Sequence, residues 1–341
     1  MHRFAILPAL VSLAAIPNDK CRSLDCARDD SASSIAVATK HDGNWEIHLV
    51  SLDGAQRTQL TRRGGQTRFP LWAPDGSKLA FGAQTSAVTW SWELWVMNAD
   101  GSGATRIADS IAAKAHRQWS PDGQRIVFER TRDGRRVIFG ARADGSALAP
   151  LTDGRADDRD PTFSPDGSRI AFTSSRDGRS SIWLMRADGS APTRLTRGAG
   201  EDMSPTWSPD GSTIAFVSTR DGGRDVYRMR PDGTALERLT VGADATRDIS
   251  QWSPDGSSLA IQTAHGKNYD IELVRIADRT RTPLAASSAY DGQFAWSPDA
   301  KSIAFISDRD GYEALYVADA SGANVRRITS EPSLNPAWRP R

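Results

Sequence analysis

Cysteine and histidine are scarce in this sequence, which limits the chemistry that the chain supports. The two cysteines, Cys21 and Cys26, both precede residue 35, so disulfides do not hold the rest of the chain together. The histidines are His2, His41, His48, His116 and His265. Because a metal site needs several converging ligands, and these lie far apart in the sequence, we expect no metal and no cofactor. The alternative is a metal site at which His116 and His265 approach the same face.

Catalytic motifs and an excess of charge are also missing. The sequence has no Gly-x-Ser-x-Gly elbow, no His-Glu-x-x-His pair and no phosphate-binding glycine loop followed by lysine. Its 43 basic and 42 acidic residues leave a net charge of +1, which disfavours a nucleic-acid partner. We therefore expect a protein that is not an enzyme and does not bind nucleic acid.

The longest apolar run lies at the N-terminus and is too short to span a membrane. It extends over residues 4–16, follows a basic Arg3 and contains the small residues Ala14 and Ala15. We interpret residues 1–15 as a signal peptide and expect a periplasmic or secreted protein; the alternative is a disordered N-terminus. Residues 16–34 form the predicted linker, in which Cys21 and Cys26 could pair; the alternative is that Cys21 carries a lipid.

A five-residue phrase, Trp-Ser-Pro-Asp-Gly, organises the remaining chain. It starts intact at Trp119, Trp207 and Trp252, with near-copies at Trp72, Phe163 and Trp296 and a broken copy at Trp338. Successive copies are separated by 47, 44, 44, 45, 44 and 42 residues. A steady period of about 40–50 residues is typical of propeller blades with four strands each.

The interior of each copy predicts strands and turns. Short apolar runs such as Ile170–Phe172 and Ile182–Met185 alternate with Asp-Gly turns, a pattern typical of β-hairpins. The first copy, which begins at Ile35, lacks its opening Trp phrase, and the chain ends in an opening strand around Trp338. We therefore predict an all-β, seven-bladed propeller of four-stranded antiparallel blades over residues 35–341, in which the C-terminal strand completes the N-terminal blade.

The repeat resembles that of a known family. The Trp-Ser-Pro-Asp-Gly phrase, the Ile-Ala-Phe runs at Ile170, Ile214 and Ile303, and the Arg-Leu-Thr endings at Arg194 and Arg238 resemble the WD40-like (PD40) repeats of TolB propellers. The resemblance implies export and binding of a partner. The chain departs from TolB itself, which has six blades behind an N-terminal α/β domain. The repeats also precede peptidase domains in other proteins, and we expect no such domain in this chain.

Binding residues are expected where the copies differ. The links before each Trp or Phe vary in charge, and their side chains are predicted to ring the mouth of the central channel. The candidate residues are Arg68, His116, Arg117, Asp158, Asp160, Asp202, Arg247, Asp248 and Asp291. Trp90, in an insertion of the second copy, is a further candidate because exposed tryptophan often dominates binding. The alternative for the charged residues is that they solvate the links and pair with one another.

These observations predict a monomeric, non-enzymatic scaffold that binds a protein or peptide at the cell envelope. The alternative is a propeller enzyme, a lyase or hydrolase acting on saccharides or peptides at the channel mouth. A compact cluster of histidine and carboxylates would favour this enzyme.

Overall fold

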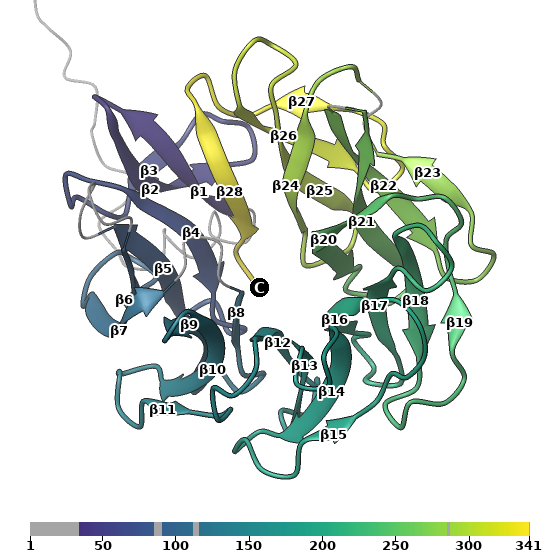
Figure 1. Cartoon of the computed structure of the whole chain (residues 1–341). Helices are drawn as coiled ribbons and strands as arrows, with labels where there is room; N and C mark the ends of the chain where they lie inside the picture. Colours follow the sequence, from purple (N-terminus) through teal and green to yellow (C-terminus); the bar gives the residue numbers. More distant parts are fainter. Residues whose placement is uncertain (1–33, 85–90, 112–115, 267, 285–286, 341) are drawn as a thin grey trace, which may run out of the picture.

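The chain folds into a ring of antiparallel β-sheets around a central axis (Figure 1). The computed structural model describes residues 34–340 other than 85–90, 112–115, 267 and 285–286; the side chains of residues 245–250 and of His265 are also not described. The predicted signal peptide and both cysteines lie outside this range. No helix occurs among the described residues, and the all-β prediction is confirmed.

The strands group into seven four-stranded units, which we number as blades 1–7. Five are separate sheets, and blades 2 and 3 join into one eight-stranded sheet through a single bridge between Ile111 and Arg130. Blade 1 consists of β28, β1, β2 and β3, and each following blade takes the next four strands in order.

Each blade runs outward from the axis in the order of its strands, apart from β28, which precedes β1 in space (Figure 1). The innermost strands are β28 (Ser333–Trp338), β4 (Thr67–Trp72), β8 (Arg117–Trp119), β12 (Asp158–Phe163), β16 (Asp202–Trp207), β20 (Ala245–Trp252) and β24 (Asp291–Trp296). The second strands are β1 (Ser34–His41), β5 (Lys78–Gln84), β9 (Arg125–Arg132), β13 (Arg169–Ser174), β17 (Ile214–Ser218), β21 (Ser258–His265) and β25 (Ser302–Ser307).

The outer strands complete the blades. The third strands are β2 (Asn44–Ser51), β6 (Trp92–Asn98), β10 (Arg135–Arg142), β14 (Ser181–Arg186), β18 (Asp225–Met229), β22 (Asn268–Arg275) and β26 (Ala314–Asp319). The outermost strands are β3 (Arg57–Gln59), β7 (Thr105–Ile111), β11 (Ala149–Pro150), β15 (Thr193–Arg194), β19 (Glu237–Arg238), β23 (Arg281–Pro283) and β27 (Arg326–Arg327).

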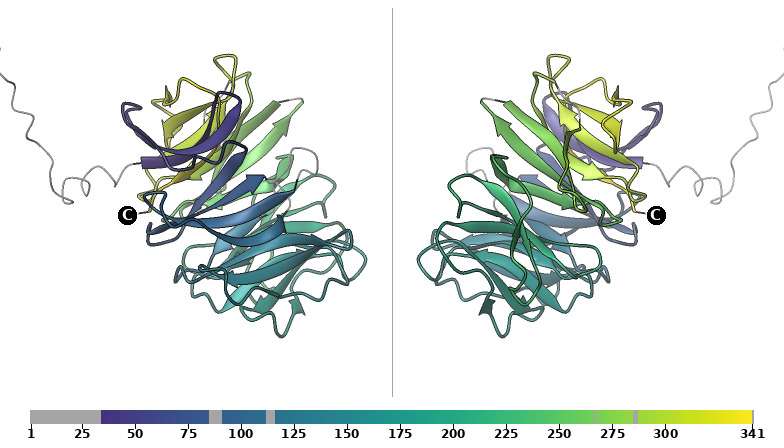
Figure 2. Two further views of the ribbon diagram at one scale, coloured as in Figure 1. Left: turned by 90° about the vertical axis from the view of Figure 1, so that its left-hand side faces the viewer. Right: turned by 90° about the vertical axis from the view of Figure 1, so that its right-hand side faces the viewer.

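Strands from the two ends of the described chain share blade 1, as the repeat predicts. β28 pairs antiparallel with β1, with Ile35 opposite Trp338, and the N–H of Arg339 donates to the carbonyl of Ser34 at 3.0 Å. The C-terminal end therefore lies beside the start of β1 (Figure 2). This pairing removes a free strand edge at the point where the ring would otherwise open.

Tryptophan side chains connect neighbouring blades at the inner strands. The indole Nε1 of Trp338 donates to the carbonyl of Ala295 at 2.9 Å, and Trp119 donates to Leu71 at 3.0 Å. Trp72 makes the same bond to Ala337 at 3.2 Å, across the junction between blades 1 and 2. The Trp of the repeated phrase thus joins each of these blades to the one before it.

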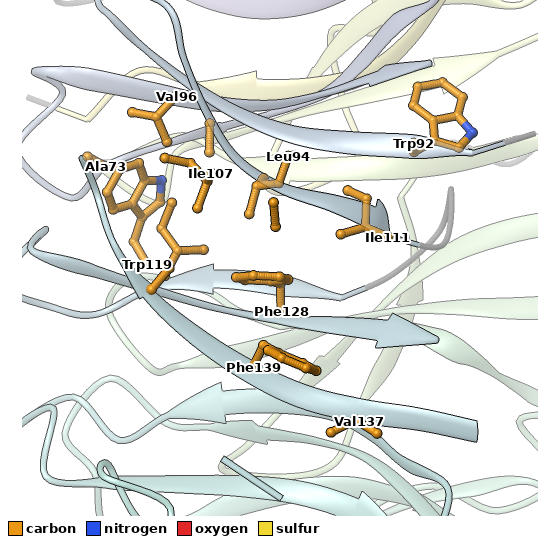
Figure 3. Packing of buried hydrophobic residues seen from close by; sticks show 14 residues of the cluster. Ala73, Trp92, Leu94, Val96, Ile107, Ile111, Trp119, Phe128, Val137 and Phe139 are labelled. Carbon is orange, nitrogen blue, oxygen red and sulfur yellow. The ribbon is translucent and has the colours of Figure 1, made fainter. Parts of the chain in front are cut away.

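Apolar side chains fill the space between the blades. Between blades 2 and 3, Leu94, Ile107 and Trp119 belong to one buried cluster, and the rings of Phe128 and Phe139 stack with centroids 6.3 Å apart (Figure 3). The apolar runs of the repeat supply these residues because alternate side chains of each strand point to opposite faces of the sheet. With the space between the blades filled, the inner strands of the seven blades surround the axis.

Candidate functional site

All seven inner strands contribute to one central cavity. It has a volume of about 380 Å³ and lies on the axis of the ring. Its amide-bearing lining residues are Gln118, Gln251, Gln293 and Asn335, and its hydroxyl-bearing ones are Thr162, Ser204 and Thr206. The prolines Pro70, Pro161, Pro205 and Pro336 form apolar parts of the wall. The lining is therefore mixed, with directional polar groups held between apolar surfaces.

The residues three positions before each phrase Trp or Phe form what we call the channel ring. In the described side chains these are Phe69, His116, Asp160, Ser204, Gln293 and Asn335, and every one lines the cavity. Each is of a different type, whereas the turns and strands around them repeat. The seventh, Ile249, lies where side chains are not described.

Most of the channel ring has a strained backbone. Phe69, Asp160, Ser204, Gln293 and Asn335 all have positive φ, between 46° and 60°, which costs about 1–3 kcal/mol at a residue other than glycine. The strand register shifts at the same points, for example between Arg159 and Thr162, so each of these five residues lies at a β-bulge. Bulges of this kind re-aim side chains, here into the cavity.

Proline explains how the bulge is accommodated. Pro70, Pro161, Pro205 and Pro336 each follow a ring residue directly. A bulge leaves a backbone N–H without a partner in the ladder, and proline has no N–H to leave unpaired.

A histidine and two carboxylates meet at the junction of blades 3 and 4. Nδ1 of His116 lies 2.9 Å from Asp160 Oδ1 and 3.7 Å from Glu129 Oε1. Oδ2 of Asp160 accepts a hydrogen bond from Thr173 at 2.8 Å, and Glu129 Oε1 accepts one from the Asp160 N–H at 2.7 Å. Both carboxylates are buried, while the His116 side chain is 36% exposed.

The electrostatics of this cluster favour a charged pair. Burial opposes the charge on His116, but Asp160 and Glu129 outweigh it and raise the imidazole pKa well above its usual value. Against the opposing effect of burial, the His116 cation holds the pKa of Asp160 at about 2. The three ligand atoms lie within 4.8 Å of one another, so the same groups are placed to bind a cation once the imidazole proton leaves.

Arg117 has a different environment from the other candidate arginines. Its guanidinium lies 5.1 Å above the ring of Phe69, and its Nη1 is buried without a hydrogen-bond partner. Burial lowers the pKa of Arg117 to about 10, which leaves the group charged at neutral pH. The side chain lines the cavity beside His116.

Three predicted acidic residues lie inside their blades, which corrects the expectation that they ring the channel mouth. Asp158, Asp202 and Asp291 are between 0% and 4% exposed, and none of them lines the cavity. Each accepts a hydrogen bond from an arginine eighteen residues later; these arginines are Arg176, Arg220 and Arg309. Each guanidinium also lies over a phenylalanine of the second strand, at 5.4–5.6 Å. The Arg-Asp-Gly turns of the repeat supply these arginines.

The remaining candidates lie apart from the described cavity wall or outside the described side chains. Arg68 donates to Gln66 Oε1 at 2.7 Å and lies over Trp45 at 4.5 Å, outside the lining of the cavity. Arg247 and Asp248 belong to β20, where side chains are not described, and Trp90 lies outside the described residues.

Several cavity residues could not be recognised among the sequence candidates, because most of those candidates were chosen for their charge. Glu129 directly follows the apolar run of β9, and nothing in the sequence indicates its contact with His116. Gln118, Ser204, Gln293 and Asn335 are neutral and were not singled out. Their fixed distance from the repeated Trp was the signal that could have found them.

A family model described as the TolB beta propeller domain matches residues 29–159, 154–251 and 246–341. The chain belongs to the TolB β-propeller family. The matched segments overlap and cover every blade, so the family's repeat accounts for the whole ring. Among the described residues no helix is long and apolar enough to cross a membrane.

Solved structures with this fold include proteins with different activities. TolB from Acinetobacter baumannii is 18% identical, with 90% of this chain and 82% of that chain covered and a TM-score of 0.58. An oligogalacturonate lyase in complex with manganese is 18% identical, with 84% of this chain and 86% of that chain covered and a TM-score of 0.69. A puromycin-hydrolyzing peptidase of Mycobacterium tuberculosis is 15% identical, with 92% of this chain and 55% of that chain covered and a TM-score of 0.65. At these identities the likeness shows the fold alone.

Proposed function

We propose that this TolB-family propeller is a monomeric, exported scaffold that binds a peptide segment of a partner protein in its central channel and catalyses no reaction. The proposal of a periplasmic or secreted location rests on the sequence of residues 1–15. The observation that carries the binding proposal is the channel ring: the repeat is uniform around it, yet each of its described residues differs and most have a strained backbone.

The chemistry of the wall supports a peptide as the occupant. Gln118, Gln251, Gln293 and Asn335 present amide groups, the type of group that pairs with a peptide bond, and Oδ1 of Asn335 is buried without a partner. The prolines between them add apolar surface without N–H groups that would compete. Loop and strand-end residues on a rigid scaffold commonly bind ligands in this way.

Filling the cavity tests the proposal. The probe is a random heptapeptide library selected on immobilised protein. We expect the wild type to enrich peptides and Thr206→Trp, which places an indole in the cavity wall, to enrich none. Thr193→Trp is the matched control because Thr193 is exposed on the outermost strand β15.

Both variants must retain the wild-type melting temperature within a few degrees; Thr162→Trp on β12 replaces Thr206→Trp if the latter unfolds. Absence of enrichment by the wild type would refute peptide binding. Equal enrichment by the cavity-filled and control variants would refute the channel as its site.

A metal-dependent lyase or hydrolase is a second candidate, favoured by the cluster of His116, Glu129 and Asp160. The donor set of one imidazole and two carboxylates fits a divalent cation, but a proton on His116 competes for the same place. Calorimetric titration of Mn²⁺ and Zn²⁺ at pH 8 tests it, with Asp160→Asn as the comparison. One-to-one binding that this substitution abolishes supports the candidate, and absence of binding at millimolar metal removes it.

A further inference from the structure

Arg117 is a cation whose charge the described chain leaves unmatched. Arg176, Arg220 and Arg309 each pair with a buried aspartate, whereas Arg117 has neither a hydrogen bond nor an ion pair with any described residue. Its one contact of note is with the face of Phe69. The Nη1 of Arg117 is withdrawn from water without an anion, which costs free energy, and folding alone gives no reason to keep it.

The position that Arg117 occupies makes the charge more unusual. It lies two residues before the phrase Trp, and the same position holds Pro70, Pro161, Pro205 and Pro336 in four other blades. The inner strand therefore folds with a small apolar residue there. Nothing in the architecture of the blade requires a cation at this point, so a partner for Arg117 is expected in the cavity that it lines.

An unsatisfied acceptor lies in the wall of the same cavity. The N–H and Nδ2 of Asn335 both donate to Gln293 Oε1, at 2.8 and 3.0 Å, while Oδ1 of Asn335 is buried without a partner. The cavity thus offers an unmatched cationic donor at Arg117 and an unmatched acceptor at Asn335. A ligand that satisfies both carries an anionic oxygen and an N–H group.

We propose that Arg117 binds a carboxylate of a peptide held in the channel, while Asn335 accepts a hydrogen bond from one of its backbone N–H groups. Arginine suits this role because its planar fork binds both oxygens of a carboxylate. A saccharide is a poorer fit. Of the two phenylalanines in the wall, Phe69 is covered by Arg117 and touched by Trp92, and Phe294 is 3% exposed, so neither offers a free stacking face.

This inference rests on the proposed function and is tested with the same heptapeptide library. We expect peptides enriched by the wild type to carry a required carboxylate, either at an Asp or Glu side chain or at the free C-terminus. Synthesis of the best peptide with each carboxyl group amidated in turn distinguishes these two sources. Arg117→Gln should weaken binding of the acidic peptide by about 10- to 100-fold and leave its amidated form unaffected.

Two further variants separate ligand binding from structure. Arg68→Gln is the matched control, because Arg68 is also a partly buried inner-strand arginine stacked on an aromatic ring, but it lies outside the cavity. Its substitution should leave peptide affinity unchanged. Arg117→Lys should restore part of the affinity, since it keeps the charge and loses the fork.

Thermal unfolding without peptide provides a second measurement. Because Arg117→Gln removes no hydrogen bond and no ion pair, this variant should melt at or above the wild-type temperature, whereas substitution of a structural arginine would lower the melting temperature. Enrichment of peptides without a carboxylate preference, or equal affinity of Arg117→Gln and wild type for the acidic peptide, would overturn this inference and leave peptide binding standing. Failure of the wild type to enrich any peptide would overturn both.

Discussion

The hydrogen bond by which Trp338 joins blade 1 to blade 7 should contribute measurably to stability. Trp338 is 8% exposed, and its indole donates to the carbonyl of Ala295 at 2.9 Å. Trp338→Phe keeps most of the buried ring and removes the donor, so it should lower the free energy of unfolding by about 0.5–1.5 kcal/mol. Trp338→Ala also creates a cavity and should lower it by about 3–5 kcal/mol.

The chain contains a close control for the first substitution. Trp207 holds the same place in blade 5 and is 6% exposed, but its indole N–H is buried without a partner. Blade 4 has Phe163 at this position. Trp207→Phe therefore removes a similar amount of buried surface and no hydrogen bond, so it should lower the free energy of unfolding by about 0.5–1.5 kcal/mol less than Trp338→Phe does. The difference between the two Phe variants isolates the inter-blade bond.

Urea unfolding followed by far-ultraviolet circular dichroism measures these free energies. The expected order of stability is wild type and Trp207→Phe first, then Trp338→Phe, then Trp338→Ala. Deletion of Leu334–Arg341 should cost at least as much as Trp338→Ala and should promote association on gel filtration, because β1 then has a free edge. Equal stability of the two Phe variants would refute the inter-blade bond, and a monomeric, fully stable deletion would refute closure through β28.

Three further predictions concern other repeated or buried contacts. Asp202→Asn removes the charge that faces Arg220 at 2.8 Å inside blade 5 and should lower the free energy of unfolding by about 3–5 kcal/mol in urea; unchanged stability would make the pair dispensable. The pair of His116, whose pKa is raised, and Asp160, whose pKa is lowered to about 2, should stabilise the fold fully between about pH 4 and 6.5 and progressively less as the pH rises through the folded-state pKa of His116. In His116→Gln the melting temperature should therefore depend less on pH above about pH 6.5 than in the wild type. The same pH dependence in both proteins would refute the stabilising role of the His116–Asp160 pair. Thr240→Val removes the hydroxyl that accepts the N–H of Val226 at 2.9 Å and should cost about 1–3 kcal/mol by the same urea assay; no loss would show that water replaces it.

The blades could be predicted from the sequence because each local signal agrees with the repeat. The Asp-Gly turns, the apolar runs and the phrase Trp recur at one period, and the strand order follows from their succession. The pairing of Ile35 with Trp338 could also be predicted. The first copy of the repeat lacks an inner strand, and the last copy consists of little more than an inner strand. These features depend on short-range patterns that repetition makes easy to recognise.

The orientation of the acidic side chains could not be predicted in the same way. Simple alternation places Asp158, Asp160 and Thr162 on one face of β12, so the sequence predicts both aspartates at the channel mouth. The bulge at Asp160 breaks this alternation. Asp160 therefore lines the cavity, whereas Asp158 is buried within blade 4 and accepts a hydrogen bond from Arg176. A shift of one residue reverses the faces of a strand, and the alternation of residues along β12 does not locate a bulge of this kind.

The closing strand and the strained channel ring depend on each other. Positive φ at residues such as Gln293 and Asn335 persists only where the surrounding structure enforces it. That enforcement comes from the inner strands, which the indole bonds of Trp296 and Trp338 fix to their neighbours. Because Asn335 lies on β28 and donates to Gln293 of blade 7, closure of the ring also sets the geometry of the binding surface. The repeated positions thus supply stability, which leaves the ring positions free to differ and to recognise a ligand.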